Sequence, residues 1–532
     1  MTSVKEILAG RMGGFGSDES ALVEKAYAFA KKAHEGATRF SGEPYFVHPS
    51  AVAKTLAEYG MDGTTVAAGL LHDTVEDGHA SAEEIEGAFG PDVRFLVEGV
   101  TKLGKHKYRG AERHAESLRR LLVATASDVR VLIIKLADRY HNMQTLEHVA
   151  PEKRRRIALE TLEIYAPIAD RLGMGKMQQE LADLAFPFVD ADACAHTAAL
   201  LASKTKETAA GLAKMQKAVR RALAKNGLTD FRTGIRIKGL WSLHEKLARK
   251  GDDISLIHDI AALRIIVPDT ADCYKALSIV HALYKPLPGR FKDYIAVPKP
   301  NGYRSLHTTV VTPHAGIVEV QIRSEEMHRA AEFGIASHTA YKELGDSQGA
   351  GRGTSARFAA FSLGWARWLI PSLLRFSRPE AAGAVPKVET PRWLAELADA
   401  HAGATGSAEF VQGLKEDFFS YRIFVFTPKG DVIDLPAGST PIDFAYALHS
   451  DLGEHLAGAK VNGKMAAIDT KLASGDVVEI LRREHAKPSA KWLDMAKTTL
   501  ARKRIRVALG LTEPDKPPRP KRARQVRHGK KA

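Results

Sequence analysis

The chain has 532 residues, of which 45% are hydrophobic and 26% are charged, so we expect three or four folded domains. No apolar segment follows the opening MTSVKEILAG, and Cys194 and Cys273 form neither a ligand pair nor a disulfide framework. This composition excludes a disulfide scaffold and predicts a cytoplasmic protein without a secretory signal. The net charge of +14 suits polyphosphate and RNA partners equally well.

Residues 20 to about 190 show only helical periodicity, with the apolar run Val66–Leu71 predicting a buried helix. The letters HDTVED, residues 72–77, follow this run directly. At 3.6 residues per turn His72 would lie above Glu76, and Asp73 above Asp77. Because burying unpaired charge is costly, a bound metal ion is the economical explanation of this cluster. The alternative is a solvated helix face that binds nothing.

Two further side chains occur in similar settings. His48 lies in SGEPYFVHPSAV, just before a proline that can open the next helix, and Asp138 lies in KLADRYHNM after an apolar run. The predicted ligand set is therefore His48, His72, Asp73 and Asp138. Nitrogen and oxygen ligands without a thiolate suit manganese, iron or magnesium better than a structural zinc ion.

Strand signals begin after a basic helical connector that ends at Gly227. Short β-branched runs predict strands at 263–267, 307–312 and 317–323. In the last run Val318, Val320 and Ile322 alternate with Glu319, Gln321 and Arg323. We expect the first set to face a core and the second to face a cleft.

Glu319 on this strand and Asp259 in IHDIAALR are two carboxylates that could hold Mg²⁺ against a triphosphate. Cationic side chains that could neutralise transferring phosphoryl groups are Arg236, Lys238, Lys246, Arg264, Arg290, Lys292 and Arg323. The sequence contains no G-x-x-x-x-G-K-[ST] loop, which excludes a P-loop enzyme. The alternative is a solvated basic surface around an ordinary sheet.

The C-terminal third begins with a Trp-containing apolar run at 357–376, where Pro371 and three arginines argue against a transmembrane helix. It predicts an interfacial helix or one that packs against a domain or a partner. RIFVFTPKGDVIDL then predicts a hairpin, Thr440-Pro441 a helix start, and DVVEIL a strand. One or two basic helices follow. The basic tail from Leu511 is expected to be disordered, either as a solubilising end or as a contact for RNA phosphates.

Several of these segments carry a family resemblance. RFSGEPYFVHP, LLHDTVED and KLADRYHNM resemble the HD-type hydrolase domain of the long RelA/SpoT homologues, which make and degrade the alarmone (p)ppGpp. The resemblance continues through GIRIKGLWSLHEKL, IHDIAALRIIV, GRFKDYIAVPKPNGYRSLHTTV and VEVQIRSEEMHRAAEFGIASH into a TGS-like segment. It implies an all-α HD-type hydrolase domain, an α+β nucleotidyltransferase-like synthetase domain and a small β-grasp TGS domain.

The resemblance implies a domain order along the chain. The hydrolase domain would span 1–195, and the synthetase domain would span 227–345 after a helical connector at 196–226. A linker with amphipathic helices would span 346–418, and the TGS domain 419–484. A basic helix at 485–510 and the tail at 511–532 would end the chain, without the usual ACT module.

The resemblance also implies roles in the hydrolase domain. His48, His72, Asp73 and Asp138 would bind Mn²⁺, while Glu76 and Asp77 would orient or deprotonate the attacking water. The nucleotide would be held by Arg39, Asn142 and Thr145.

In the synthetase domain, the resemblance implies that Asp259 and Glu319 bind Mg²⁺ and that Glu319 helps to activate the acceptor's ribose 3′-hydroxyl. Tyr303 would stack on the acceptor guanine. The other implied nucleotide-binding residues are Arg236, Lys238, Ser242, Lys246, Arg264, Arg290, Lys292, Asn301, His307 and Gln321. The quartet RFKD at 290–293 is the form typical of bifunctional members. In the TGS segment, His449 would contact the acceptor end of tRNA.

The implied function is a bifunctional enzyme with ATP, GDP or GTP, and (p)ppGpp as its ligands. Simultaneous synthesis and hydrolysis would waste ATP, so a bistable arrangement of the two domains is expected. An alternative keeps only hydrolysis, with the synthetase domain as a guanine-nucleotide sensor. A non-catalytic RNA-binding or ribosome-binding regulator would leave the HDTVED cluster unexplained.

Overall fold

The computed structural model describes residues 1–101, 128–257, 259–299, 301–336, 422–483 and 485–511. The chain divides into two compact units, Met1–Asp399 and Ala400–Ala532. No helix within these described ranges has both the length and the hydropathy needed to cross a membrane. The predicted amphipathic segment at 357–376 and nearly all of the basic tail lie outside the described residues.

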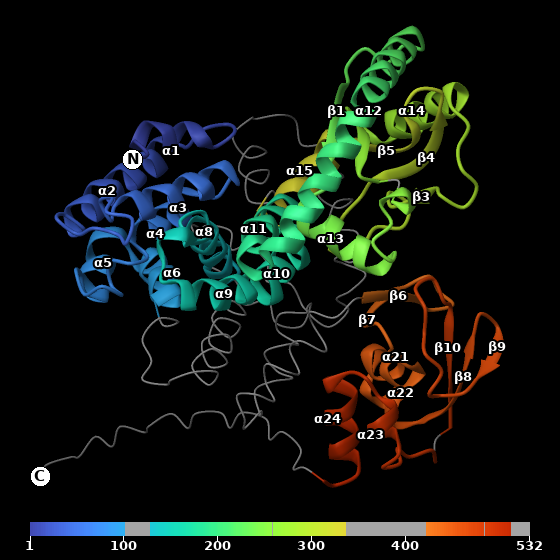
Figure 1. The fold of residues 1–532 in the computed structure, drawn as a ribbon. Helices are drawn as coiled ribbons and strands as arrows, with labels where there is room; N and C mark the ends of the chain where they lie inside the picture. The colour runs from blue at the N-terminus through green and yellow to red at the C-terminus, as the bar shows by residue number, and fades with distance from the viewer. Residues whose placement is uncertain (102–127, 258, 300, 337–421, 484, 512–532) are drawn as a thin grey trace, which may run out of the picture. The chain divides into compact units, whose positions relative to one another are not determined.

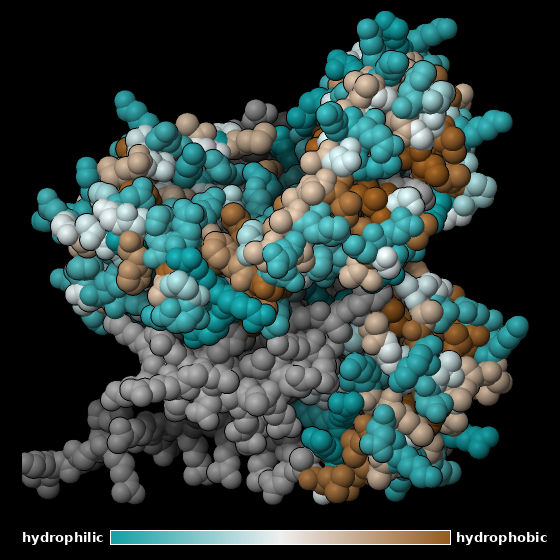
Figure 2. Space-filling view, viewed as in Figure 1, coloured by the Kyte–Doolittle hydropathy of each residue, from teal (hydrophilic) through white to brown (hydrophobic). Residues whose placement is uncertain are grey.

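The first part of the larger unit is helical, as its periodicity predicts (Figure 1). Its helices are α1 (Val4–Gly10), α2 (Ser17–Ala33), α3 (Val47–Glu58), α4 (Gly63–Leu71), α5 (Ala82–Phe89), α6 (Pro91–Thr101), α8 (Arg130–Gln144), α9 (Pro151–Glu160), α10 (Ala166–Arg171) and α11 (Gly175–Val189). The apolar helix α4 is almost entirely buried and packs against α2, α3 and α6. Hydrophilic residues cover most of the visible face of these helices (Figure 2).

The HDTVED segment corrects one expectation, because it does not continue the helix. Helix α4 ends at Leu71, and residues 72–78 form successive turns. The backbone N–H and hydroxyl of Thr74 both donate to the Leu71 carbonyl, at 3.0 and 2.6 Å, and so occupy an acceptor that a continuing helix would use. Gly78 then takes a positive φ of 77°. The four polar groups therefore do not share one helical face.

The second part of the larger unit is a mixed five-stranded sheet with the order β1-β2-β5-β4-β3. Its strands are β1 (Arg232–Ile237), β2 (Ala261–Val267), β3 (Lys292–Asp293), β4 (Leu306–Thr312) and β5 (Gly316–Ser324). Strands β2 and β5 are parallel, and the other neighbours are antiparallel. The helices are α12 (Ala191–Lys225), α13 (Leu240–Arg249), α14 (Thr270–Leu283) and α15 (Glu325–Phe333). The predicted connector forms most of α12.

Helices α12 and α14 cover one face of this sheet and build its core. Val318, Val320 and Ile322 lie in that core, as their alternation predicts. The expectation that the opposite face is open is wrong at one end. Gln321 and Arg323 are only 4% and 2% exposed, and Arg323 lies 3.9 Å from Glu332 of α15. Helix α15 therefore covers this end of the polar face.

The smaller unit confirms the predicted hairpin, helix and strands. Its elements are β6 (Arg422–Phe426), β7 (Val432–Pro436), α21 (Pro441–Leu448), α22 (Ser450–Glu454), β8 (Leu456–Val461), β9 (Lys464–Ala466), β10 (Val478–Arg482), α23 (Trp492–Met495) and α24 (Thr499–Ala508). Asp443 of α21 is buried and accepts from the backbone N–H groups of Lys497 and Thr498. These groups lie between α23 and α24, the two short helices of the segment where one or two basic helices were predicted.

Candidate active sites

The four predicted metal ligands converge in the helical part. His48 is in the first turn of α3, His72 and Asp73 follow α4, and Asp138 is on α8. The His48 Nε2 atom lies 3.3 Å from Asp138 Oδ1 and 3.6 Å from Asp73 Oδ2, and His72 Nε2 lies 3.1 Å from Asp73 Oδ1. Both histidines and Asp138 are at most 5% exposed. Candidate ligand atoms of His48, His72 and Asp138 lie within 4.8 Å of one another.

The hydrogen bonds around His72 fix its tautomer. Its Nδ1 atom lies 2.8 Å from the Gly69 carbonyl oxygen, which can only accept, so Nδ1 carries the proton. The Nε2 atom is therefore a lone-pair donor. It is buried and forms no hydrogen bond of normal geometry, although it lies 3.1 Å from Asp73 Oδ1. A histidine held through one nitrogen by a backbone carbonyl, with the other nitrogen free, is the usual arrangement of a metal ligand.

A second chain of contacts fixes His48. Arg39 Nη1 donates to His141 Nδ1 at 2.9 Å, so the His141 nitrogen is an acceptor. His48 Nδ1 lies 3.0 Å from the same nitrogen and must donate to it. This leaves His48 Nε2 facing two carboxylates, which is favourable when that nitrogen carries a second proton or when a cation lies among these atoms. The residues present therefore fit a divalent metal ion.

The electrostatics keep both carboxylates ionised. Burial alone would raise the pKa of Asp138, but Lys135 Nζ at 2.7 Å and the nearby imidazoles hold the pKa well below its usual value. Burial also acts against the charge of Asp73, and His72 and His48 reverse the effect and lower its pKa. Two negative charges thus remain at this centre at neutral pH.

Two rows of cross-strand neighbours organise the five-stranded sheet. Arg264, Gln321, His307 and Lys292 are paired in succession across β2, β5, β4 and β3. In the adjacent row Arg236 pairs with Ala262, and Ala262 pairs with Glu319. Since paired residues, and residues two apart on a strand, lie on one face, the predicted nucleotide-binding side chains share the face opposite the core.

The two carboxylates of this face have different partners. Asp259 forms ion pairs with Lys246 and, at 2.6 Å, with Lys238, whereas Glu319 Oε1 lies 2.9 Å from His307 Nδ1. Burial alone would raise the pKa of Asp259, but Lys238 and Lys246 lower it to about 2. Burial likewise opposes ionisation of Glu319, and His307 lowers its pKa overall, while the charge of Asp259 acts in the opposite direction. The two acids therefore lie close enough to influence each other.

A directed hydrogen-bond chain fixes Glu319. Tyr303 donates its hydroxyl proton to His307 Nε2 at 2.7 Å, because His307 Nδ1 carries the proton that faces the carboxylate. Arg323 Nη2 donates to the Tyr303 oxygen at 3.3 Å, and Gln321 Nε2 donates to Glu319 Oε1 at 2.9 Å. Four side chains thus hold the carboxylate in one orientation.

Comparison with known proteins places all three predicted domains in the expected order. The family models described as HD domain, region found in RelA/SpoT proteins, and TGS domain match residues 26–175, 235–346 and 423–482, respectively. The chain belongs to the RelA/SpoT family. This family assignment agrees with the two polar centres and with the β-sheet unit that follows them.

Three relatives of the RelA/SpoT chain illustrate the named activities. A probable guanosine-3′,5′-bis(diphosphate) 3′-pyrophosphohydrolase of Synechocystis is 43% identical over 92% of this chain and 61% of its own length. A GTP pyrophosphokinase of Myxococcus xanthus is 44% identical over 91% and 60%, respectively. The bifunctional (p)ppGpp synthase/hydrolase SpoT of Escherichia coli is 41% identical over 92% and 65%. The chain spans less than two thirds of the length of each.

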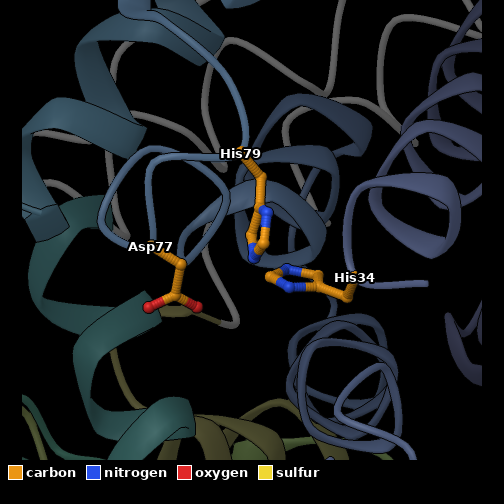
Figure 3. A group of neighbouring side chains, drawn as sticks. All are labelled: His34, Asp77 and His79. Carbon is orange, nitrogen blue, oxygen red and sulfur yellow. The ribbon is translucent and has the colours of Figure 1, made fainter. Parts of the chain in front are cut away.

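Only some of the remaining predicted residues of this RelA/SpoT chain lie beside the candidate metal ligands. Arg39 Nη2 donates to Asn142 Oδ1 at 3.0 Å and lies 3.4 Å from Thr145 Oγ1, so all three adjoin the metal centre. Glu76 is half-buried, and its pKa is raised by burial and influenced by Lys135. Asp77 instead lies beside His34 and His79 (Figure 3).

Around the five-stranded sheet, Arg290 and Lys292 are exposed, and Ser242 is half-buried on α13. Asn301 Nδ2 donates to the Asp170 carbonyl of the helical part at 3.1 Å. In the smaller unit, His449 is exposed and its Nδ1 accepts from the Asp451 N–H at 3.2 Å, which caps α22.

Two residues of the hydrolase centre escaped the sequence reasoning. His141 and Lys135 lie three residues after and three residues before Asp138 on α8. This spacing places them on the same helical face as Asp138, and it was a usable signal within the segment KLADRYHNM.

Proposed function

We propose that this chain is a bifunctional alarmone enzyme. It transfers pyrophosphate from ATP to the ribose 3′-hydroxyl of GDP or GTP, and it hydrolyses (p)ppGpp to GDP or GTP and pyrophosphate. The observation that carries the proposal is the presence of two separate, internally ordered polar centres in one chain, each in the domain type that its chemistry requires.

In the hydrolase centre, His48, His72, Asp73 and Asp138 would hold Mn²⁺, whose mixed nitrogen and oxygen ligands suit this ion. The bound ion would lower the pKa of a water molecule that attacks the 3′-pyrophosphate. Glu76 accepts the proton of that water, because burial raises its pKa toward the range of a useful general base. Arg39, Asn142 and Thr145 bind the nucleotide, whereas Asp77, whose carboxylate lies near His34 and His79, takes no part in this step.

In the synthetase centre, Asp259 and Glu319 would hold Mg²⁺, which prefers carboxylate and phosphate oxygens. Glu319 accepts the proton of the 3′-hydroxyl as that oxygen attacks the β-phosphorus of ATP, and AMP leaves. Arg236, Lys238 and Arg264 neutralise charge on the ATP side, where phosphoryl transfer is mainly an electrostatic problem. Tyr303 stacks on the guanine, and the hydrogen bond from its hydroxyl to His307 keeps its ring in place.

The TGS unit would contact the acceptor end of tRNA through His449, which is exposed at the start of α22. A His449→Ala variant should bind tRNA less tightly than the wild type, and tRNA with a blocked acceptor end should not distinguish the two proteins. Equal affinity of both proteins for uncharged tRNA would contradict this role.

The direct test incubates the purified chain with ATP and GDP in Mg²⁺, and separately with ppGpp in Mn²⁺. We expect ppGpp and AMP from the first mixture, and GDP and pyrophosphate from the second. Hydrolysis without synthesis would instead support a hydrolase whose synthetase domain only senses guanine nucleotides.

A further inference from the structure

A second group of potential ligands lies beside the hydrolase centre. His34 is the C-cap residue of α2, and Asp77 and His79 come from the turns after α4. Their candidate ligand atoms all lie within 4.8 Å of one another (Figure 3). This group shares no residue with the set His48, His72 and Asp138.

His34 is the unusual member of this group. It is only 2% exposed, and both of its ring nitrogens are buried without a hydrogen-bond partner. Its ring stacks on Tyr45 with centroids 4.8 Å apart and meets the His79 ring edge-on at 5.1 Å. A buried polar group without a partner is costly, so this imidazole is suited to a ligand that the protein itself does not provide.

The other two members make the group accessible. Asp77 and His79 are exposed, so an ion can enter from solvent and reach the buried His34. The donor set of two imidazoles and one carboxylate is typical of zinc sites with an open coordination position and of other first-row transition ions. Three protein ligands leave at least one coordination position for water.

We propose that His34, Asp77 and His79 form a second metal site, which binds a divalent transition-metal ion of the Zn²⁺ class. The Tyr45 side chain separates it from the hydrolase centre, since its ring stacks on His34 and its hydroxyl donates to Asp73 at 2.9 Å. The site therefore fixes the end of α2 to the turns that carry the hydrolase residues.

The test measures Zn²⁺ binding to the full-length chain by equilibrium dialysis with elemental analysis, and Co²⁺ binding by its visible absorption. The wild-type protein should bind one more ion per chain than His79→Ala, or should bind its weakest-held ion at least about tenfold more tightly than the variant does. His148→Ala removes a partly exposed histidine elsewhere and should match the wild type. His34→Asn should behave like His79→Ala.

A His48→Ala variant separates this site from the hydrolase centre, because it should lose an ion there and keep the one at His34. Equal stoichiometry and affinity in wild type and His79→Ala would overturn the proposal. Loss of all tight binding in His48→Ala would overturn it as well. Because these measurements do not use catalysis, they stand whether or not the proposed alarmone reactions are observed.

Discussion

Replacing Asp73 by Asn tests the hydrolase centre with little change of shape. The carboxylate lies 3.1 Å from His72 Nε2 and accepts from the Tyr45 hydroxyl at 2.9 Å. The asparagine oxygen can still accept the hydrogen bond from Tyr45, but a neutral acceptor makes this bond weaker by about 1 kcal/mol than the charged carboxylate does. Its repulsion with Asp138 is removed at the same time. We therefore expect the free energy of unfolding of the metal-free variant to lie within about 1 kcal/mol of that of the metal-free wild type.

The effect should appear when metal is added. Loss of an outer-shell partner costs about 10–100-fold in metal affinity, so loss of a charged ligand should cost at least about 100-fold. At a Mn²⁺ concentration one hundred times the wild-type Kd, stabilisation of the folded state would fall from about 2.7 to about 0.4 kcal/mol. Thermal unfolding with and without Mn²⁺ measures this loss, and ppGpp hydrolysis should fall in parallel.

The matched control is Asp18→Asn, which removes an exposed carboxylate of α2 and should change neither quantity. Unchanged Mn²⁺ dependence of hydrolysis in Asp73→Asn would refute the ligand assignment.

The remaining predictions concern three other parts of the larger unit. Glu319→Gln should slow pyrophosphate transfer by about 10²–10⁴-fold and spare hydrolysis, with the exposed Glu326→Gln as control; transfer within tenfold of wild type would make Glu319 structural. Gly334→Ala should lower the free energy of unfolding of the larger unit by about 3 kcal/mol, because φ is 58° and the new Cβ would lie 2.1 Å from the Leu172 carbonyl oxygen. The control Gly87→Ala places its Cβ in open space on α5 and should raise the free energy of unfolding slightly. Burial raises the pKa of Cys273 to about 12, so at pH 8 this thiol should resist alkylation until the chain unfolds. The neutral thiol of Cys273 contributes its full stability to the fold below the ordinary pKa of cysteine, and this contribution is lost as the pH rises toward 12. Rapid alkylation of Cys273 in the native protein would contradict its burial.

Sequence patterns predicted most of the elements and singled out four polar residues that converge, because both signals depend on local chemistry. The alternation of Val318, Val320 and Ile322 determines which face of β5 is buried. The composition of HDTVED required a counter-charge whatever its backbone conformation. The outcome is a centre with the predicted residues, reached through turns rather than through one helix.

Other features depended on tertiary contacts that no local pattern contains. The alternation on β5 correctly places Arg323 on the face opposite the core, yet α15 buries its side chain against Glu332. The pairing of His34 with Asp77 and His79 joins residues more than 40 positions apart through the packing of α2 on α4. The break after Leu71 depends on the competition of Thr74 for one carbonyl, which helical periodicity cannot reveal.

The most direct test of the central claim measures both reactions in three proteins under one set of conditions. AMP formation from ATP and GDP, and pyrophosphate release from ppGpp, would be followed in wild type, Asp73→Asn and Glu319→Gln. We predict that the wild type carries out both reactions, that Asp73→Asn retains only synthesis, and that Glu319→Gln retains only hydrolysis. Loss of both reactions in either properly folded variant would contradict two independent centres, and absence of synthesis in the wild type would contradict the bifunctional assignment.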